Sequence, residues 1–195
     1  MTDIKCRKAQ LRSDLRQRRN ALTLDQQNIA ALAVIDSVVS LPDWKNAQKI
    51  AMYLAIDGEI NTSALEHLAR GLPKEIFLPL ITANDLGFAQ WHENGLLSPN
   101  RYNIPQPLES SVQCPASELD IIFLPMVGWD RHGGRLGMGG GFYDRALSNI
   151  SDPVLVGLAH ESQRVNEIPS ERWDITLDYV ATDAGLYHCL KQSKF

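Results

Sequence analysis

The stretch LDIIFLPMVGWDRHGGRLGMGGGFYDRAL, residues 119–147, places the most apolar run of the chain directly before its densest cluster of glycines. A continuous apolar run such as 119–129 is typical of a central strand that is buried on both faces. The segment FYDRALSNI, residues 142–150, has the pattern of a helix. Six of the thirteen glycines fall within residues 133–145. Since glycine loses more backbone freedom on folding than any other residue, this cluster needs a local reason.

Outward from this stretch, apolar runs with strand character alternate with helical patterns. The expected strands are 49–55, 75–81, 87–92, 119–129, 154–160 and 178–183, and the expected helices are 4–20, 24–40, 62–70 and 142–150. This alternation predicts an α/β fold with a mostly parallel open sheet flanked by helices, and with a glycine-rich strand-to-helix loop. Residues 93–118 are rich in Pro, Asn and Ser and predict a loop with short turns. No internal repeat or linker is evident, so residues 1–195 are expected to form one domain.

Composition excludes several classes of protein. The formal net charge of -4 argues against bulk binding of nucleic acid, which needs a basic surface. No apolar run approaches the roughly 18 residues of a membrane span. Three widely spaced cysteines do not make a disulfide framework or a zinc site. The charged amino-terminal segment lacks the apolar core of a signal peptide, so we expect a reduced, cytoplasmic protein that acts as a monomer.

The loop at residues 133–145 has the properties of a phosphate site. Backbone N–H groups of a glycine-rich turn between a strand and a helix can approach a phosphate closely. Neither the P-loop spacing nor a complete GxGxxG fingerprint is present, because Phe142 takes the last position of the latter. Arg135 and Arg145 can neutralise phosphate oxygens. Asp144 would then need a cation such as Mg²⁺ beside the phosphate; the alternative is a tight turn in which Asp144 caps its helix.

The same residues carry a family resemblance. The segment LPMVGWDRHGGRLGMGGGFYDRAL resembles the signature segment of the 5-formyltetrahydrofolate cyclo-ligases, also called methenyltetrahydrofolate synthetases. Five further segments agree in order and spacing from about residue 8 to residue 183: KAQLR, MYLAIDGEINT, RYNIPQP, VGLAHESQ and ERWDITLDYVATD. The resemblance implies conversion of 5-formyltetrahydrofolate, which can be polyglutamylated, to 5,10-methenyltetrahydrofolate. ATP would activate the formyl oxygen by phosphorylation and yield ADP and phosphate, with Mg²⁺ required.

The resemblance also implies the residues of the site. For ATP they are the first-helix cations and the loop: Lys8, Arg12, Arg135, Leu136, Gly137, Met138, Gly139, Gly140, Gly141, Phe142 and Tyr143. For the folate they are a strand-end pair, a loop aromatic and part of the glycine loop: Leu54, Glu59, Tyr102, Met138, Gly139, Gly140, Gly141 and Phe142. Arg135 and Arg145 would be catalytic, and Asp144 and Asp174 would bind the metal. Without the resemblance, Asp174 cannot be chosen over Asp178 or Asp183.

Some positions stay open. Lys8 and Arg12 lie one helical turn apart, and from the sequence alone they read as part of a solvated charged face. Arg16, Arg18 and Arg19 keep that interpretation. Some family members carry basic residues inside the loop, where this chain has Met138 and Gly140. His132 and Gln163 receive no firm role.

Three other functions are alternatives to the cyclo-ligase activity. A sugar-phosphate isomerase on a similar sheet would need no ATP and would leave the paired aspartates unexplained. An RNA-binding module would use the basic first helix, with affinity that falls steeply as salt rises. A folate-binding homologue without activity is the third, although every implied ligand position is filled.

Overall fold

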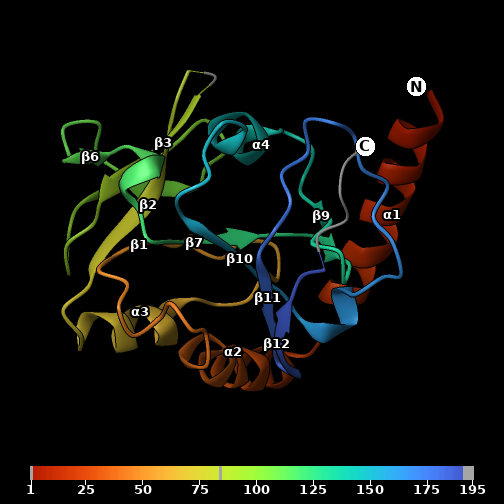
Figure 1. Cartoon of the computed structure of the whole chain (residues 1–195), viewed down its shortest axis with the longest axis horizontal. Helices are drawn as coiled ribbons and strands as arrows, with labels where there is room; N and C mark the ends of the chain where they lie inside the picture. Colours follow the sequence, from red (N-terminus) through yellow and green to blue (C-terminus); the bar gives the residue numbers. More distant parts are fainter. Residues whose placement is uncertain (1, 84, 191–195) are drawn as a thin grey trace.

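The computed structural model describes residues 2–83 and 85–190, and within them one large sheet dominates (Figure 1). The sheet has eight strands in the order β12-β11-β10-β7-β1-β2-β3-β6. The five central strands from β11 to β2 are parallel, and β12, β3 and β6 are antiparallel to their neighbours. The bounds are β1 Lys49–Ala51, β2 Glu75–Thr82, β3 Asp85–Gln90, β6 Gln113–Cys114, β7 Ile121–Pro125, β10 Val154–Leu158, β11 Tyr179–Thr182 and β12 Gly185–His188. The predicted α/β fold with a mostly parallel sheet is confirmed.

Helices cover both faces of the sheet. α2 (Leu24–Val39) and α3 (Ser63–Arg70) lie on one face, and the short α4 (Phe142–Leu147) lies on the other (Figure 1). The central strand β7 is buried throughout its apolar part and faces both layers. Ile121 and Phe123 belong to the core under α2 and α3, whereas Ile122 and Leu124 belong to the core that includes Leu147 of α4. Because successive side chains of a strand point to opposite faces of the sheet, β7 contributes to two separate cores.

The first helix stands apart from these layers. α1 (Thr2–Asn20) runs beside β9 at one end of the molecule (Figure 1). It packs through Leu15, which is fully buried against Val127, Leu136 and Ile168. Because most of its other side chains are charged or polar, this narrow apolar stripe fixes which face of α1 turns inward.

The expected strand 119–129 is shorter than predicted. β7 ends at Pro125, and the chain continues into a two-stranded hairpin of β8 (Gly128–Trp129) and β9 (Arg135–Leu136). The buried carboxylate of Asp130 organises the hairpin turn, because it accepts hydrogen bonds from the backbone N–H groups of His132, Gly134 and Ile168. Gly133 has φ +82°, and a Cβ there would lie 2.6 Å from a backbone oxygen. Two of the six clustered glycines therefore serve the hairpin.

Several smaller elements also differ from the expectations. The expected strand 49–55 pairs only over β1, which ends at Ala51. The predicted loop 93–118 contains β4 (Leu97–Pro99), β5 (Pro105–Pro107), β6 and the 3₁₀ helix η1 (Ala116–Glu118). The edge strand β12 and the 3₁₀ helix η2 (Glu161–Gln163) were not predicted. These pieces are two to four residues long, which is too short for a hydrophobic period to develop.

Two expectations about composition can be compared with the structure. Among the described helices, none combines the length and the apolar character that crossing a bilayer demands. Cys6 is exposed, and Cys114 and Cys189 are buried.

Candidate active site

A cavity of about 1030 Å³ opens at the carboxyl ends of the parallel strands β1 and β7. This is the edge at which open α/β sheets bind ligands. Its walls come from α1, the segment after β1, β2, the 100–105 loop, the glycine loop 137–141 and the segment 171–174. Every residue that the resemblance implied for ATP, folate or metal lines this cavity: Lys8, Arg12, Leu54, Glu59, Tyr102, residues 135–145 and Asp174.

Lys8 projects from α1 into a pair of carboxylates. Its Nζ lies 2.6 Å from Oδ2 of Asp174 and 3.0 Å from Oε2 of Glu171. Burial alone would lower the pKa of Lys8, but the hydrogen bonds that Lys8 donates to Asp174 and Glu171, together with their negative charges, outweigh burial and raise the pKa above the ordinary value. The interpretation of Lys8 as part of a solvated face is therefore wrong, because the side chain is buried.

Arg135 and Asp144 form a second ion pair across the glycine loop. Nη2 of Arg135 lies 2.8 Å from Oδ1 of Asp144, and the Arg135 side chain is almost fully buried. Oδ1 of Asp144 also accepts a hydrogen bond of 3.2 Å from the backbone N–H of Ile175. Asp144 therefore contacts the residue that follows Asp174, and both aspartates expected to bind metal line the cavity. In this structure Lys8 binds Asp174 and Arg135 binds Asp144, although both basic residues were expected to bind phosphate.

These carboxylates are too few to form a complete metal site on their own. Within residues 2–83 and 85–190, no group of three or more His, Cys, Asp or Glu side chains is arranged to hold a metal. Mg²⁺ usually keeps several waters and is bound by one or two carboxylates together with substrate phosphates. Asp144 and Asp174 fit that pattern, in which the nucleotide supplies the remaining oxygens.

The glycine loop is held open by two arginines. Nε of Arg12 donates to the carbonyl of Gly137 at 2.8 Å, and Nη1 of Arg145 donates to the carbonyl of Gly140 at 2.9 Å. Gly139 has φ +103° and Gly141 has φ +64°, conformations that favour glycine. Arg145 thus braces the loop from within.

Leu136 differs from the neighbouring loop residues in that its side chain is buried in the core. Its side chain is buried with Leu15, Val127 and Ile168 in the core beneath α1. Its carbonyl accepts a hydrogen bond from the N–H of Val127. The residue therefore anchors the start of the loop, and its side chain is turned away from a ligand.

Two aromatic rings form another part of the cavity wall. The rings of Tyr102 and Phe142 meet edge to face, with centroids 5.8 Å apart. The guanidinium of Arg101 lies 5.0 Å from the centroid of Tyr102 and 5.6 Å from that of Phe142. Tyr102 and Met138 are each 50% exposed, so both can contact a planar ligand without rearrangement.

Glu59 is a carboxyl group of the cavity wall that follows β1. Its Oε2 accepts a hydrogen bond of 3.1 Å from the N–H of Ile56. Burial raises its pKa to about 7, and the hydrogen bond from Ile56 and the charge of Arg19 offset only part of this effect. Glu59 therefore changes its charge near neutral pH, where an ordinary carboxyl group is fully ionised.

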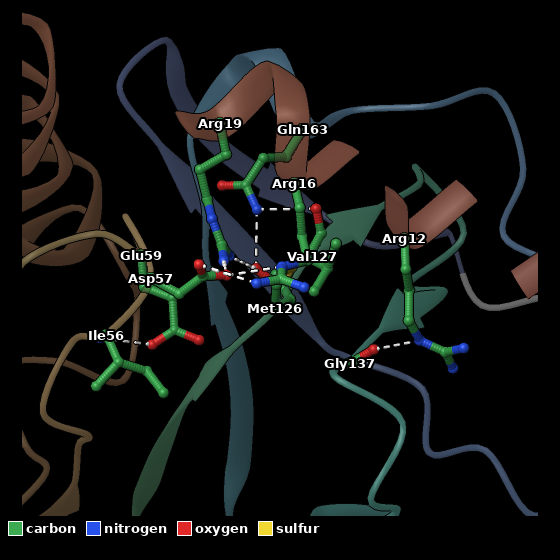
Figure 2. Close-up of polar contacts among 10 residues, drawn as sticks. All are labelled: Arg12, Arg16, Arg19, Ile56, Asp57, Glu59, Met126, Val127, Gly137 and Gln163. Carbon is green, nitrogen blue, oxygen red and sulfur yellow. Dashed lines mark hydrogen bonds and ion pairs between the residues drawn. The ribbon is translucent and has the colours of Figure 1, made fainter. Parts of the chain in front are cut away.

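The expected solvated face of α1 needs a correction at Arg19. Arg18 is exposed, but Arg19 is completely buried and Arg16 is bound to Asp57 by two hydrogen bonds (Figure 2). The sequence pattern places Arg19 among other arginines and gives no indication that a partner from residue 57 reaches it.

Two open positions receive structural roles. Nε2 of Gln163 donates to the carbonyls of Met126 and Val127, and its Oε1 accepts from the N–H of His160 (Figure 2). Gln163 thus ties η2 to the chain after β7. The N–H of His132 donates to Asp130 in the hairpin turn. Neither residue lines the cavity described above.

The cavity also has lining residues that the sequence did not predict, and two of them lie near Asp174. Glu171 binds Lys8, and Trp173 lines the cavity with 59% of its surface exposed. Both lie within three residues of Asp174. Their closeness to the candidate metal ligand Asp174 was the one indication of a role in the site. Single residues of these types are usually surface charges or packed side chains.

Comparison with known proteins identifies the family. The model of the 5-formyltetrahydrofolate cyclo-ligase family matches residues 4–183. The chain belongs to this family. It is 37% identical over 177 residues to the 5-formyltetrahydrofolate cyclo-ligase of Haemophilus influenzae, covering 88% of this chain and 95% of the relative. It is 37% identical over 181 residues to the cyclo-ligase of Escherichia coli, covering 89% and 98% of the two chains.

The family fold is also recovered among solved structures. The structure of Aquifex aeolicus 5,10-methenyltetrahydrofolate synthetase superposes with a TM-score of 0.83 at 28% identity, over 96% of this chain and 95% of that one. A methenyltetrahydrofolate synthetase from Mycoplasma pneumoniae shares the fold with a TM-score of 0.74 at 20% identity, over 90% and 98% of the two chains. The resemblance stated from the sequence is therefore confirmed at the level of the family and its fold.

Proposed function

We propose that the protein is an ATP-dependent ligase that cyclises 5-formyltetrahydrofolate to 5,10-methenyltetrahydrofolate, with Mg²⁺ bound by Asp144 and Asp174. One observation carries this proposal beyond family membership. A single cavity joins a cation-rich wall suited to phosphates with an aromatic wall suited to a pterin. Both substrates of a phosphoryl transfer can therefore meet in it.

The reaction needs such a meeting. A formamide carbonyl is a poor electrophile, and its oxygen is a poor leaving group. In the proposed reaction the formyl oxygen attacks the γ-phosphorus of ATP, and ADP leaves. N10 of the folate then attacks the activated formyl carbon and releases its proton to solvent, the C–O bond breaks, and phosphate departs with the original formyl oxygen. The protein has to align the reactants and stabilise negative charge.

The ion pairs of the cavity suit these tasks. Lys8 and Arg135 are held by Asp174 and Asp144 in the structure. A bound Mg²⁺ would supply positive charge that polarises phosphate oxygens. Asp144 and Asp174 would hold this cation, and Arg135 and Lys8, which Glu171 also binds, would then be available to phosphate oxygens.

The other predicted residues divide between the two substrates. Arg12 and Arg145 hold the carbonyls of Gly137 and Gly140, and we propose that this leaves the loop N–H groups directed at phosphate. Arg145 then acts as a brace, with Arg135 as the arginine that meets the developing charge. Tyr102 and Phe142 would stack against the pterin, and Leu54 and Glu59 would close the other side of the folate pocket.

The test is a direct assay. Purified protein, 5-formyltetrahydrofolate, Mg²⁺ and ATP are mixed, and the near-ultraviolet absorbance of the methenyl product is followed. Parallel samples omit ATP or Mg²⁺ or contain the Asp144→Ala variant. We expect product only in the complete wild-type mixture. Absence of product from folded protein that binds ATP would overturn the proposal and leave the cavity as a phosphate site for another substrate.

We further propose that residues 1–195 act as one domain, since Lys8 and Asp174, which lie far apart in the sequence, line the same cavity. We propose that this domain acts as a monomer in the cytoplasm. The glutamate tail of the folate would extend from the exposed Tyr102 side. Sedimentation during turnover would test the monomer, and activity that disappears on dilution would contradict it.

A further inference from the structure

Arg19 is a buried cation in an otherwise solvated stretch of α1. It is 0% exposed, whereas its neighbour Arg18 is exposed. Its Nη2 lies 2.5 Å from Oδ2 of Asp57, and its Nη1 donates to the carbonyl of Met126 at 3.1 Å (Figure 2). Removing a guanidinium from water is costly unless its partners are well placed, so this arrangement strongly fixes the segments that it joins.

One of those segments is a tight turn. The N–H of Glu59 donates to the carbonyl of Ile56 at 3.0 Å, and the two residues between them have positive φ, +52° at Asp57 and +76° at Gly58. Asp-Gly is a favoured pair for such a turn, because aspartate tolerates the left-handed region better than most residues. The carboxylate of Asp57 is thus held on one side of the turn by α1.

The other side of the turn faces the cavity. Ile56 and Glu59 line it, and so does Met126, whose carbonyl Arg19 also binds. Arg19 and Asp57 are not part of that lining. The ion pair therefore touches two parts of the cavity wall from behind and can influence a ligand only through them.

We propose that the Arg19–Asp57 ion pair positions the Glu59 carboxyl for folate binding, an inference that rests on the proposed function. Arg19 and Asp57 are positioning residues. They fix the Ile56–Glu59 turn against the end of β7, so that Glu59 meets the folate in one orientation. Arg16 also donates two hydrogen bonds to Asp57. Because these α1 arginines are bound to Asp57, the carboxyl of Glu59 remains available for the ligand.

The experiment compares Asp57→Asn and Arg19→Met with the control Arg18→Met. Asparagine tolerates the backbone conformation of Asp57 but lacks its charge. We expect KM for 5-formyltetrahydrofolate to rise about tenfold or more in both variants, with KM for ATP changed less than about twofold. Arg18→Met should change neither constant. An equal rise of both KM values, or a loss of thermal stability alone, would overturn the proposal.

A double-mutant cycle separates positioning from general stability. Once Glu59→Gln has been introduced, Asp57→Asn should raise KM for the folate by less than about twofold more, because the positioned group is already lost. A full multiplicative effect would show that Asp57 acts independently of Glu59. If Asp57→Asn does not fold, Arg19→Lys replaces it, since lysine keeps the charge but lacks the fork that reaches both Asp57 and Met126.

A folate-independent readout distinguishes this proposal from the proposed function. The carboxyl of Glu59 can be titrated by ¹³C NMR, with Arg19, Asp57, Tyr53 and Tyr143 as the charged and titratable groups that face it. Release of the turn in Arg19→Met should let the carboxyl reach water and lower its pKa from about 7 toward the ordinary value of 4.5. An intact turn that has only lost a nearby cation would raise the pKa instead, and that outcome would refute positioning even if wild-type protein converts no folate.

Discussion

At the scale of single residues, the site is a set of matched charges. Lys8 lies against Asp174, and Arg135 lies against Asp144. The resemblance in sequence named all four residues, but the pairing could not be predicted, because the partners of Lys8 lie more than 160 positions away along the chain. The sequence also predicts a surface position for Arg19, because its partner Asp57 lies 38 positions away along the chain.

Lys8 gives the first prediction. Lys8→Met should raise KM for ATP about 30-fold, because a hydrogen bond to a charged group contributes roughly 2 kcal/mol. KM for 5-formyltetrahydrofolate should change little. Steady-state kinetics with Arg7→Met, an exposed cation one position earlier on α1, provide the matched control. An unchanged KM for ATP would show that Lys8 serves only to hold Glu171 and Asp174.

Glu59 gives a prediction about stability and pH. Its pKa rises from 4.5 to about 7 on folding, so the folded state favours the protonated form. The contribution of Glu59 to the free energy of unfolding should therefore be largest below pH 4.5 and fall by about 3 kcal/mol as pH rises through 7. Glu59→Gln stays neutral and lacks this decrease. Urea unfolding of both proteins between pH 5 and 8 measures it, and parallel stability curves would contradict the buried carboxyl.

At the scale of elements, the glycine-rich segment divides into two parts with different functions. Gly133 and Gly134 belong to the β8–β9 hairpin around Asp130, whereas residues 137–141 form the cavity wall. The sequence predicted one continuous strand-to-helix loop. It could not show the hairpin, because β8 and β9 have two residues each and the buried carboxylate that organises their turn is one ordinary aspartate.

Two substitutions in this loop should differ in effect. Gly139→Ala places a side chain at φ +103° and puts its Cβ 3.5 Å from the guanidinium carbon of Arg12. We expect it to lower the free energy of unfolding by about 1–2 kcal/mol and to weaken ATP binding. Gly137→Ala meets only the flexible end of Arg135, at 3.3 Å, and should have a smaller effect. Calorimetric titration with ATP would measure both, and equal affinities would contradict a loop shaped by Gly139.

At the scale of the whole molecule, the hydrophobic pattern of the sequence predicted the architecture well. The long apolar runs became β2, β7 and β10, and the parallel centre of the sheet follows from their alternation with helices. The antiparallel edges were less accessible. β12 follows a short turn after Thr182 and pairs with β11, and β6 pairs with β3 over only two residues. Both strands are therefore defined by tertiary contacts and not by a local hydrophobic period.

The same scale explains why the site residues converge. The segments that follow β1 and β7 end at one edge of the sheet, and α1 and the segment 171–174 close over that edge. The sequence supplied the residue types and the resemblance supplied their grouping. Only the fold shows that the cation wall and the aromatic wall enclose one cavity of about 1030 Å³.

The measurement that tests this account most directly follows the formyl oxygen. 5-Formyltetrahydrofolate labelled with ¹⁸O in the formyl group is converted by the wild-type protein with ATP and Mg²⁺, and the released phosphate is examined by ³¹P NMR. Attack of the formyl oxygen on the γ-phosphorus predicts one ¹⁸O atom in each phosphate. Unlabelled phosphate, with the methenyl product formed, would contradict direct phosphoryl transfer between the two substrates in this cavity.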